Sequence, residues 1–166
     1  VSGEINRDLD DAEEMIEMAK KVAARRPNCA IKIPCTEAGV TAARKLEQMG
    51  IRTNGTLVFS PAQAIFAAKN GSLFVSPFIG WKEANGEDCK EYIKNIVEIY
   101  KNYGFYGKTE IMCAAIRTPK QIVDCAVAGA DIVTTGLAVY QDAMKHAYTH
   151  QGLETFINAW DNTITE

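Results

Sequence analysis

A single lysine stands inside an apolar run of the sequence. The run at 29–33 reads Cys-Ala-Ile-Lys-Ile, and Lys32 is its only charged residue. A lysine at the inner end of an apolar strand is costly unless it is used or paired. Loss of solvation favours the neutral amine, and a neutral amine can attack a carbonyl to form a Schiff base. Lys32 is therefore a candidate nucleophile; the alternatives are a structural pair with Glu4 and a lysine that holds a phosphate.

Three other polar side chains could serve the same chemistry. Glu4 and Thr56 are expected to end neighbouring strands on the same side as Lys32. A carboxylate and a hydroxyl can hold one water between them, and such a water can shuttle protons at the carbinolamine stage of Schiff-base formation. Alternatively, Glu4 only neutralises Lys32. Arg117 follows the fifth expected strand and could grip an anionic group with two hydrogen bonds, or form a surface salt bridge.

Strands and helices are expected to alternate along the chain and to position these side chains. Apolar runs predict strands at 1–5, 29–33, 52–59, 73–78, 110–115 and 131–134. Helical spacing of apolar residues, bounded by prolines, glycines and polar caps, predicts helices at 9–26, 36–49, 61–70, 87–103, 119–129, 139–145 and 153–160.

The strands are mostly apolar without alternation, which indicates a parallel sheet covered on both faces. Repeating βα units give either a doubly wound sheet or a (β/α) barrel. A barrel is favoured because polar residues fall at the carboxyl ends of several strands, where barrel active sites are built. These residues are Glu4, Lys32, Thr56, Ser76, Arg117 and Thr134. The fold class expected is an α/β (β/α)8 TIM barrel of which six βα units, the third to the eighth, are present.

Composition and charge exclude several classes of function. Apolar residues make up 47% of the chain and charged residues 23%, as in ordinary soluble globular proteins. The net charge of -3 and the lack of a basic stripe argue against a nucleic-acid partner, and no apolar run approaches the ~20 residues that cross a bilayer. Five cysteines without a C-x-x-C pair predict a reducing cytoplasm, with neither disulfides nor a zinc site. His146 and His150 lack a third metal ligand nearby.

Six ordered segments give the chain a family resemblance from end to end. They are VSGE at 1–4, IKIPCTEAG at 31–39, GIRTNGTLVFSPAQ at 50–63, VSPFIG at 75–80, AGAD at 128–131 and GLE at 152–154. Together they resemble the transaldolase family in its short form, which includes fructose-6-phosphate aldolase. The resemblance implies a class I aldolase barrel that needs no metal or organic cofactor. It also implies a homo-oligomer assembled through the C-terminal helix, expected at 151–166.

The resemblance also implies roles for individual residues. Lys32 matches the Schiff-base lysine, Glu4 and Thr56 match the pair that positions the catalytic water, and Asn54 matches a substrate-binding residue. Phe78 falls where transaldolases carry phenylalanine and the aldolase subgroup carries tyrosine. Glu4 falls where that subgroup carries glutamine. Both positions favour transaldolase chemistry, in which the dihydroxyacetone unit stays bound to lysine until an aldehyde acceptor takes it.

The sequence departs from the family pattern at three places. The family begins with two more βα units, which carry an aspartate and an asparagine, so we expect residues 1–166 to form a single barrel domain without these units and the sequence to be incomplete. Trp81 and Ala115 stand where the family carries a phosphate-gripping arginine and a phosphate-contacting serine. Only Arg117 of that anion site remains, unless Lys82 takes over the phosphate. A sulfonate needs less positive charge than a phosphate, which makes sulfofructose transaldolases within the family a candidate.

The expected function is therefore a transaldolase-type enzyme. It would transfer a dihydroxyacetone unit from an anionic ketose, sulfofructose or fructose 6-phosphate, to an aldehyde acceptor. The alternatives are a fructose-6-phosphate aldolase that releases free dihydroxyacetone and, if the first two strands are truly absent, a non-catalytic barrel for sugar binding or assembly.

Overall fold

Six parallel strands form one curved sheet in the computed structural model, which describes residues 1–5, 10–26 and 28–163. The strands are β1 (Ser2–Glu4), β2 (Ala30–Pro34), β3 (Thr53–Val58), β4 (Phe74–Pro77), β5 (Glu110–Ile116) and β6 (Ile132–Thr135). They pair in chain order, each with the next. Parallel neighbours joined through helices make a partial (β/α) barrel, and the expected fold class is confirmed.

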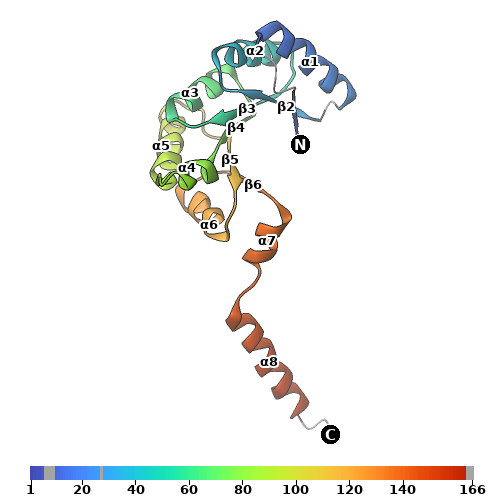
Figure 1. Cartoon of the computed structure of the whole chain (residues 1–166), viewed down its shortest axis with the longest axis vertical. Coiled ribbons are helices and arrows are strands. Elements are labelled where there is room, and N and C mark those ends of the chain that lie inside the picture. The colour runs from blue at the N-terminus through green and yellow to red at the C-terminus, as the bar shows by residue number, and fades with distance from the viewer. Residues whose placement is uncertain (6–9, 27, 164–166) are drawn as a thin grey trace.

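Helices follow the strands, and most of them cover the outer side of the sheet (Figure 1). They are α1 (Ala12–Arg25), α2 (Glu37–Gln48), α3 (Pro61–Asn70), α4 (Ile79–Ala84), α5 (Cys89–Asn102), α6 (Pro119–Ala128), α7 (Leu137–Ala143) and α8 (Ala147–Asp161). The sequence prediction missed α4 and began the last helix six residues late, at 153 instead of 147. Residue 9 of the predicted first helix and residues 164–166 of the predicted C-terminal helix lie outside the described residues.

Polar caps explain why several helices begin where they do. The side chains of Asp11, Thr36, Ser60, Asp88 and Thr118 each accept a hydrogen bond from a backbone N–H of the first turn. At the other end, α3 and α6 stop at glycines in the left-handed conformation, which costs glycine nothing. Strand ends and helix starts are thus fixed locally, which fixes the loops at the carboxyl end of the sheet.

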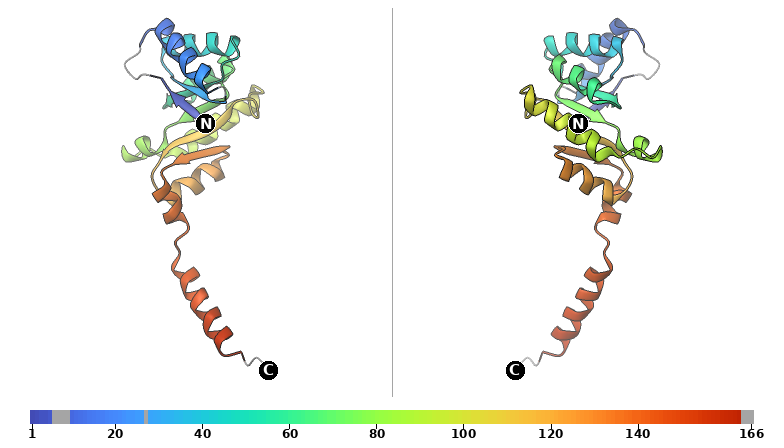
Figure 2. Two further views of the ribbon diagram at one scale, coloured as in Figure 1. Left: turned by 90° about the vertical axis from the view of Figure 1, so that its right-hand side faces the viewer. Right: turned by 90° about the vertical axis from the view of Figure 1, so that its left-hand side faces the viewer.

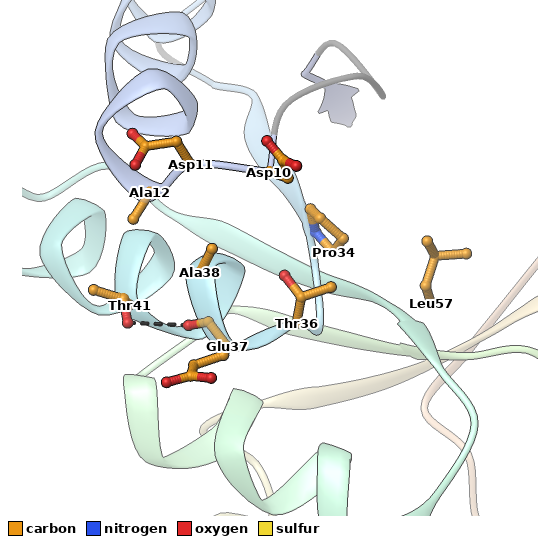
Figure 3. A pocket seen from close by; sticks show the side chains of 9 residues that line it. All are labelled: Asp10, Asp11, Ala12, Pro34, Thr36, Glu37, Ala38, Thr41 and Leu57. Carbon is orange, nitrogen blue, oxygen red and sulfur yellow. Dashed lines mark hydrogen bonds between the residues drawn. The ribbon is translucent and has the colours of Figure 1, made fainter.

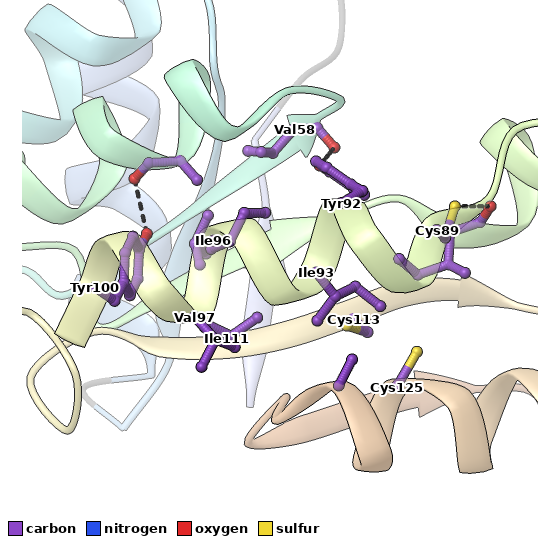
Figure 4. Packing of buried hydrophobic residues seen from close by; sticks show 14 of the residues in the cluster. Val58, Cys89, Tyr92, Ile93, Ile96, Val97, Tyr100, Ile111, Cys113 and Cys125 are labelled. Atoms are coloured by element: carbon purple, nitrogen blue, oxygen red, sulfur yellow. Dashed lines mark hydrogen bonds between the residues drawn. The ribbon is translucent and has the colours of Figure 1, made fainter. Parts of the chain in front are cut away.

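The core lies between the sheet and the helices. The larger cluster packs β3 to β5 against α3, α5 and α6, with Ile93, Ile96 and Tyr100 fully buried on α5 (Figure 4). The buried hydroxyls of Tyr92 and Tyr100 donate to the carbonyls of Val58 and Ala64, at 2.9 and 2.7 Å. Alternate strand residues therefore face the helices, and the remaining ones face the interior of the curved sheet.

A second buried cluster lies under α1 and α2. Ile31 and Ile33 of β2 pack there against Met15, Ile16 and Leu46. Since these two isoleucines flank Lys32 and point outward, the lysine side chain points to the opposite face.

The last helix, α8, extends away from the rest of the molecule (Figures 1 and 2). Leu153, Phe156, Ile157 and Trp160 are all exposed on it, and their spacing places them on one face. None of the helices in the described ranges is long and apolar enough to cross a membrane.

Candidate active site

Lys32 sits at the centre of the inner face, on β2 between β1 and β3. In the strand register, Glu4 lies opposite it on one side and Asn54 on the other. The Nζ atom of Lys32 is 3.9 Å from Oε2 of Glu4, and the two side chains are 24% and 65% exposed. The amine is thus half-enclosed but reachable, with one carboxylate close enough to exchange a proton through a bridging group.

Thr56 lies two residues beyond Asn54 on β3, opposite Pro34. It is 2% exposed, and its Oγ1 has no hydrogen-bond partner among the described residues. A buried hydroxyl without a partner costs free energy, so such groups mark positions that a ligand or a water satisfies. The strand bulges directly after it, because the register shifts between Gly55 and Val58 and Leu57 has a positive φ of 55°.

Asn54 forms a polar layer beneath the lysine. Its Nδ2 donates to Oγ of Ser2 at 3.0 Å, and Oγ of Ser76 donates to its Oδ1 at 2.8 Å. The Nδ2 atom also lies 4.0 Å from Sδ of Met112. The side chain is fully buried and ties β1, β3 and β4 together, which gives Lys32 a rigid floor. The predicted contact of Asn54 with substrate stays a prediction.

Three aromatic side chains make a wall at the carboxyl ends of β3 and β4. The rings of Phe59, Phe78 and Trp81 are mutually in contact, with centroids 5.4 to 5.9 Å apart. Trp81, on α4, is 49% exposed. The wall therefore presents an apolar surface, and the indole N–H adds one hydrogen-bond donor to it.

Arg117 follows β5 and lies beside this wall. Gly80 of α4 packs so closely on it that an added Cβ atom would meet the arginine stem at 3.2 Å and the carbonyl oxygen of Ala115 at 2.1 Å. Ala115 has a positive φ of 57°, at a register shift between Cys113 and Ile116. The exposed guanidinium is therefore carried on a bulged strand end that only a glycine can approach.

Lys82 is directed elsewhere. Its Nζ pairs with Glu87 and lies 5.0 Å from the centroid of the Tyr92 ring on α5, and its side chain is 14% exposed. A lysine held by a carboxylate and an aromatic ring is already satisfied. The alternative in which Lys82 replaces the missing arginine therefore gains nothing from this geometry.

The carboxyl ends of the strands form the mouth of the barrel. A pocket of about 750 Å³ lies on the side of this mouth away from Arg117 (Figure 3). Pro34 and Leu57 line it from the ends of β2 and β3, and Asp10, Asp11 and Glu37 add three carboxylates from the starts of α1 and α2. Lys32 is not among its lining residues. An anionic group would be repelled there, so the mouth is polarised, with an acidic side and the Arg117 side.

The cysteines near the site are not nucleophiles at neutral pH. Burial raises the pKa of the Cys35 thiol, just after β2, to about 11. Burial together with nearby carboxylates raises the pKa of the Cys89 thiol to about 11 as well. Across the residues that the structure describes, no three His, Cys, Asp or Glu side chains gather in a way that could hold a metal ion.

Sequence reasoning missed four residues that shape the mouth: Gly80, Glu83, Gln63 and Gln121. The two glutamines each accept a hydrogen bond from the first loop residue after a strand. A signal was present, because Ser-Pro-x-Gln at 60–63 and Thr-Pro-x-Gln at 118–121 repeat directly after the third and fifth strands. The repeat predicts equal turns at two places on the rim.

The fold and the lysine on its inner face define the class of protein: a partial (β/α) barrel with the layout of the Schiff-base aldolases. The family model described as Transaldolase/Fructose-6-phosphate aldolase matches residues 1–166. The chain belongs to this family. It is 55% identical over 166 residues to the 6-deoxy-6-sulfo-D-fructose transaldolases of Priestia aryabhattai and Priestia megaterium, covering 100% of this chain and 73% of each relative. It is 44% identical over 150 residues to a probable transaldolase of Coprothermobacter proteolyticus, covering 90% of this chain and 68% of that relative.

Proposed function

We propose that this chain carries the Schiff-base half of a transaldolase that moves a dihydroxyacetone unit between sugars. The observation that supports it is the half-enclosed Lys32 amine, which lies 3.9 Å from the Glu4 carboxylate on the strand next to the unpartnered Thr56 hydroxyl. The neutral amine adds to the ketose carbonyl, the carbinolamine loses water, and a protonated imine forms. The bond between C3 and C4 then breaks as the C4 hydroxyl loses its proton. The electron pair of that bond forms the C2=C3 double bond of an enamine, the C=N π pair moves to the nitrogen, and the aldehyde leaves.

Glu4 and Thr56 would bind the water that these steps release and consume, and would exchange protons with it. The carboxylate can take and return a proton, and the Thr56 hydroxyl would find its missing partner in that water. The enamine left on Lys32 would then add to the acceptor aldehyde, and hydrolysis would return the free amine. The proton of the C4 hydroxyl needs a further base. We assign this base to none of the described residues, and the chain spans 73% of the length of the sulfofructose transaldolases it matches.

The donor that we propose is a ketose with a terminal sulfonate. Arg117 supplies the positive charge, and Trp81 supplies one N–H and an apolar face, which suits a weakly hydrated monoanion. Relatives named as 6-deoxy-6-sulfo-D-fructose transaldolases, 55% identical to this chain, support this choice. The three carboxylates of the opposite pocket would keep the anionic end on the Arg117 side.

We propose transfer rather than release of the three-carbon unit because of the residue at position 78. Phe78 brings an apolar ring, without a hydroxyl, to the wall beside Trp81, 5.4 Å away between centroids. A ring without a hydroxyl offers no proton to the enamine carbon, so the enamine would persist until an aldehyde arrives.

We further propose that the protein works as a homo-oligomer in which another copy covers the apolar face of α8. Phe156 and Trp160 are 72% and 77% exposed there. A contiguous apolar face on a helix that stands clear of its own fold favours association. Sedimentation of the protein with Phe156→Glu and Trp160→Glu should give smaller species than the unmodified protein; an unchanged sedimentation coefficient would refute this part.

Trapping with borohydride tests the main proposal. Reduction in the presence of 6-deoxy-6-sulfofructose or dihydroxyacetone should leave an adduct on Lys32 and on no other lysine, as read by mass spectrometry of peptides. Lys32→Met should abolish the adduct, and Lys45→Met, which changes an exposed lysine of α2, should not. Absence of any adduct would favour a sugar-binding barrel over an enzyme. A higher kcat/KM for fructose 6-phosphate than for sulfofructose would refute the sulfonate.

A further inference from the structure

Two turns at the mouth of the barrel are built in the same way. In the turn after β3, Oε1 of Gln63 accepts the N–H of Phe59 at 2.8 Å; in the turn after β5, Oε1 of Gln121 accepts the N–H of Arg117 at 2.6 Å. In both, the helix that follows is capped by the hydroxyl residue before its proline. The glutamine thus fixes the first residue after each strand, which is aromatic in one turn and cationic in the other.

The second end of each glutamine reaches back to the preceding βα unit, and here the two turns differ. Nε2 of Gln63 donates to the backbone carbonyl of Cys35 at 3.2 Å. Nε2 of Gln121 donates to the side chain of Glu83, on α4, at 2.6 Å. Gln121 is 6% exposed, and a short bond from a buried amide to a carboxylate is stronger than a neutral one. The clamp after β5 therefore holds a helix rather than a loop carbonyl.

Helix α4 depends on such contacts for its position. It has six residues, and no side chain caps its N-terminus. A helix of this length is not stable by itself, because the cost of nucleation is not recovered over so few residues. The Glu83–Gln121 bond ties it to α6, and the close approach of Gly80 to Ala115 and Arg117 ties it to the end of β5. Movement of α4 would carry Trp81 away from Arg117.

We propose that Glu83 and Gln121 are positioning residues for the anionic end of the donor, because their hydrogen bond sets Trp81 of α4 against Arg117. This inference rests on the proposed function, in which the side chains of Trp81 and Arg117 contact the anion. The Gln121–Arg117 bond holds one side of the anion site, the Gln121–Glu83 bond holds the other, and one buried side chain therefore sets the spacing between them. Neither Glu83 nor Gln121 touches the reacting carbon.

The test compares an anionic and a neutral donor. Glu83→Ala should raise KM for the sulfonated ketose on the order of tenfold, the typical effect of losing a charge-assisted hydrogen bond, with kcat within about twofold. Trapping of dihydroxyacetone on Lys32, which needs no anion site, should proceed as in the unmodified protein. Glu83→Gln keeps an acceptor oxygen for Gln121 and should restore most of the affinity.

Glu87→Ala is the matched control, because it removes a carboxylate just beyond α4 that pairs with Lys82 and has no bond to Gln121. It should leave KM unchanged. An unchanged KM in Glu83→Ala, an equal rise in Glu87→Ala, or equal losses with both donors would overturn the proposal. If Glu83→Ala does not fold, Glu83→Asp, which shortens the reach by one methylene, gives the same comparison. Failure of the unmodified protein to trap dihydroxyacetone would instead count against the proposed function.

Discussion

Valine substitutions at Thr56 and Thr53 should have opposite effects on stability and on adduct formation, although the two residues lie on the same strand. Both are buried, at 2% and 0% exposed. Oγ1 of Thr53 donates to Glu47 at 2.7 Å and accepts from Oγ of Ser72 at 2.8 Å, whereas Oγ1 of Thr56 has no hydrogen-bond partner among the described residues. Valine has nearly the shape of threonine and lacks the hydroxyl. Thr53→Val should therefore cost about 1–3 kcal/mol of unfolding free energy, because it leaves buried polar groups short of a partner.

Thr56→Val should cost no stability, since it breaks no hydrogen bond between Oγ1 and the described residues. It should nevertheless lower the rate of Lys32 adduct formation by a factor of about 10²–10⁴, the usual size of a lost proton-transfer contribution. Thr53→Val should keep the adduct rate, because its side chain faces α2 and not the interior.

Urea unfolding gives the two free energies, and borohydride trapping with dihydroxyacetone at several times gives the two rates. The reasoning would be refuted if Thr56→Val unfolded at lower urea than the unmodified protein, or if Thr53→Val lost the adduct while Thr56→Val kept it. Either result would mean that the Thr56 hydroxyl serves the fold and not the chemistry.

Three further predictions follow from single contacts. Phe78→Tyr adds a hydroxyl to the aromatic wall and should raise the release of free dihydroxyacetone, measured with a coupled dehydrogenase; release that is already faster than transfer in the unmodified protein would contradict the transaldolase assignment. Gly80→Ala puts a Cβ atom 2.1 Å from the carbonyl oxygen of Ala115 and should lower the melting temperature by several degrees, roughly 2–4 °C per kcal/mol lost, and weaken binding of the anionic ketose. Burial raises the pKa of the Cys89 thiol from 9.0 to about 11, so the folded protein holds this proton to higher pH than the unfolded chain does. The contribution of Cys89 to the unfolding free energy should then be constant below pH 9 and be lost between pH 9 and 11, so the fall in this range should be smaller in Cys89→Ala.

The sequence predicted the strands and most helices because their signals are local. Apolar runs bounded by Gly, Pro and capping residues placed the six strands within one or two residues of their observed ends. Helix α4 carries no such signal, since it follows β4 after one residue, lacks a cap and is too short for a period to show. Helix α8 is capped by His146, whose Nδ1 accepts the N–H of Tyr148 at 3.2 Å. Histidine is not a usual cap, so the prediction started late.

The candidate site could be predicted as far as alternation along the strands allows. Lys32 between two isoleucines indicates an inward lysine, and Glu4 and Asn54 flank it in register as parallel pairing requires. The predicted roles of these residues are not tested by their positions. The strand ends were harder, because strict alternation from Thr56 would send Val58 to the interior, whereas the structure buries it in the outer core.

The bulges at the ends of β3 and β5 explain this difference. Leu57 and Ala115 adopt positive φ, which costs a residue other than glycine on the order of 1–2 kcal/mol. Neither residue type predicts this backbone conformation. Each bulge adds one residue, so that the next one returns to the core and the chain then turns into a glutamine-held loop. The hydrogen bonds of the glutamines to Phe59 and Arg117 offset part of the strain. The glutamines are the part of each bulged turn that can be recognised in the sequence. A hydroxyl-Pro-x-Gln pattern after an apolar strand thus predicts a bulge at the end of that strand. The pattern occurs at the two strand ends that carry the aromatic wall and the arginine.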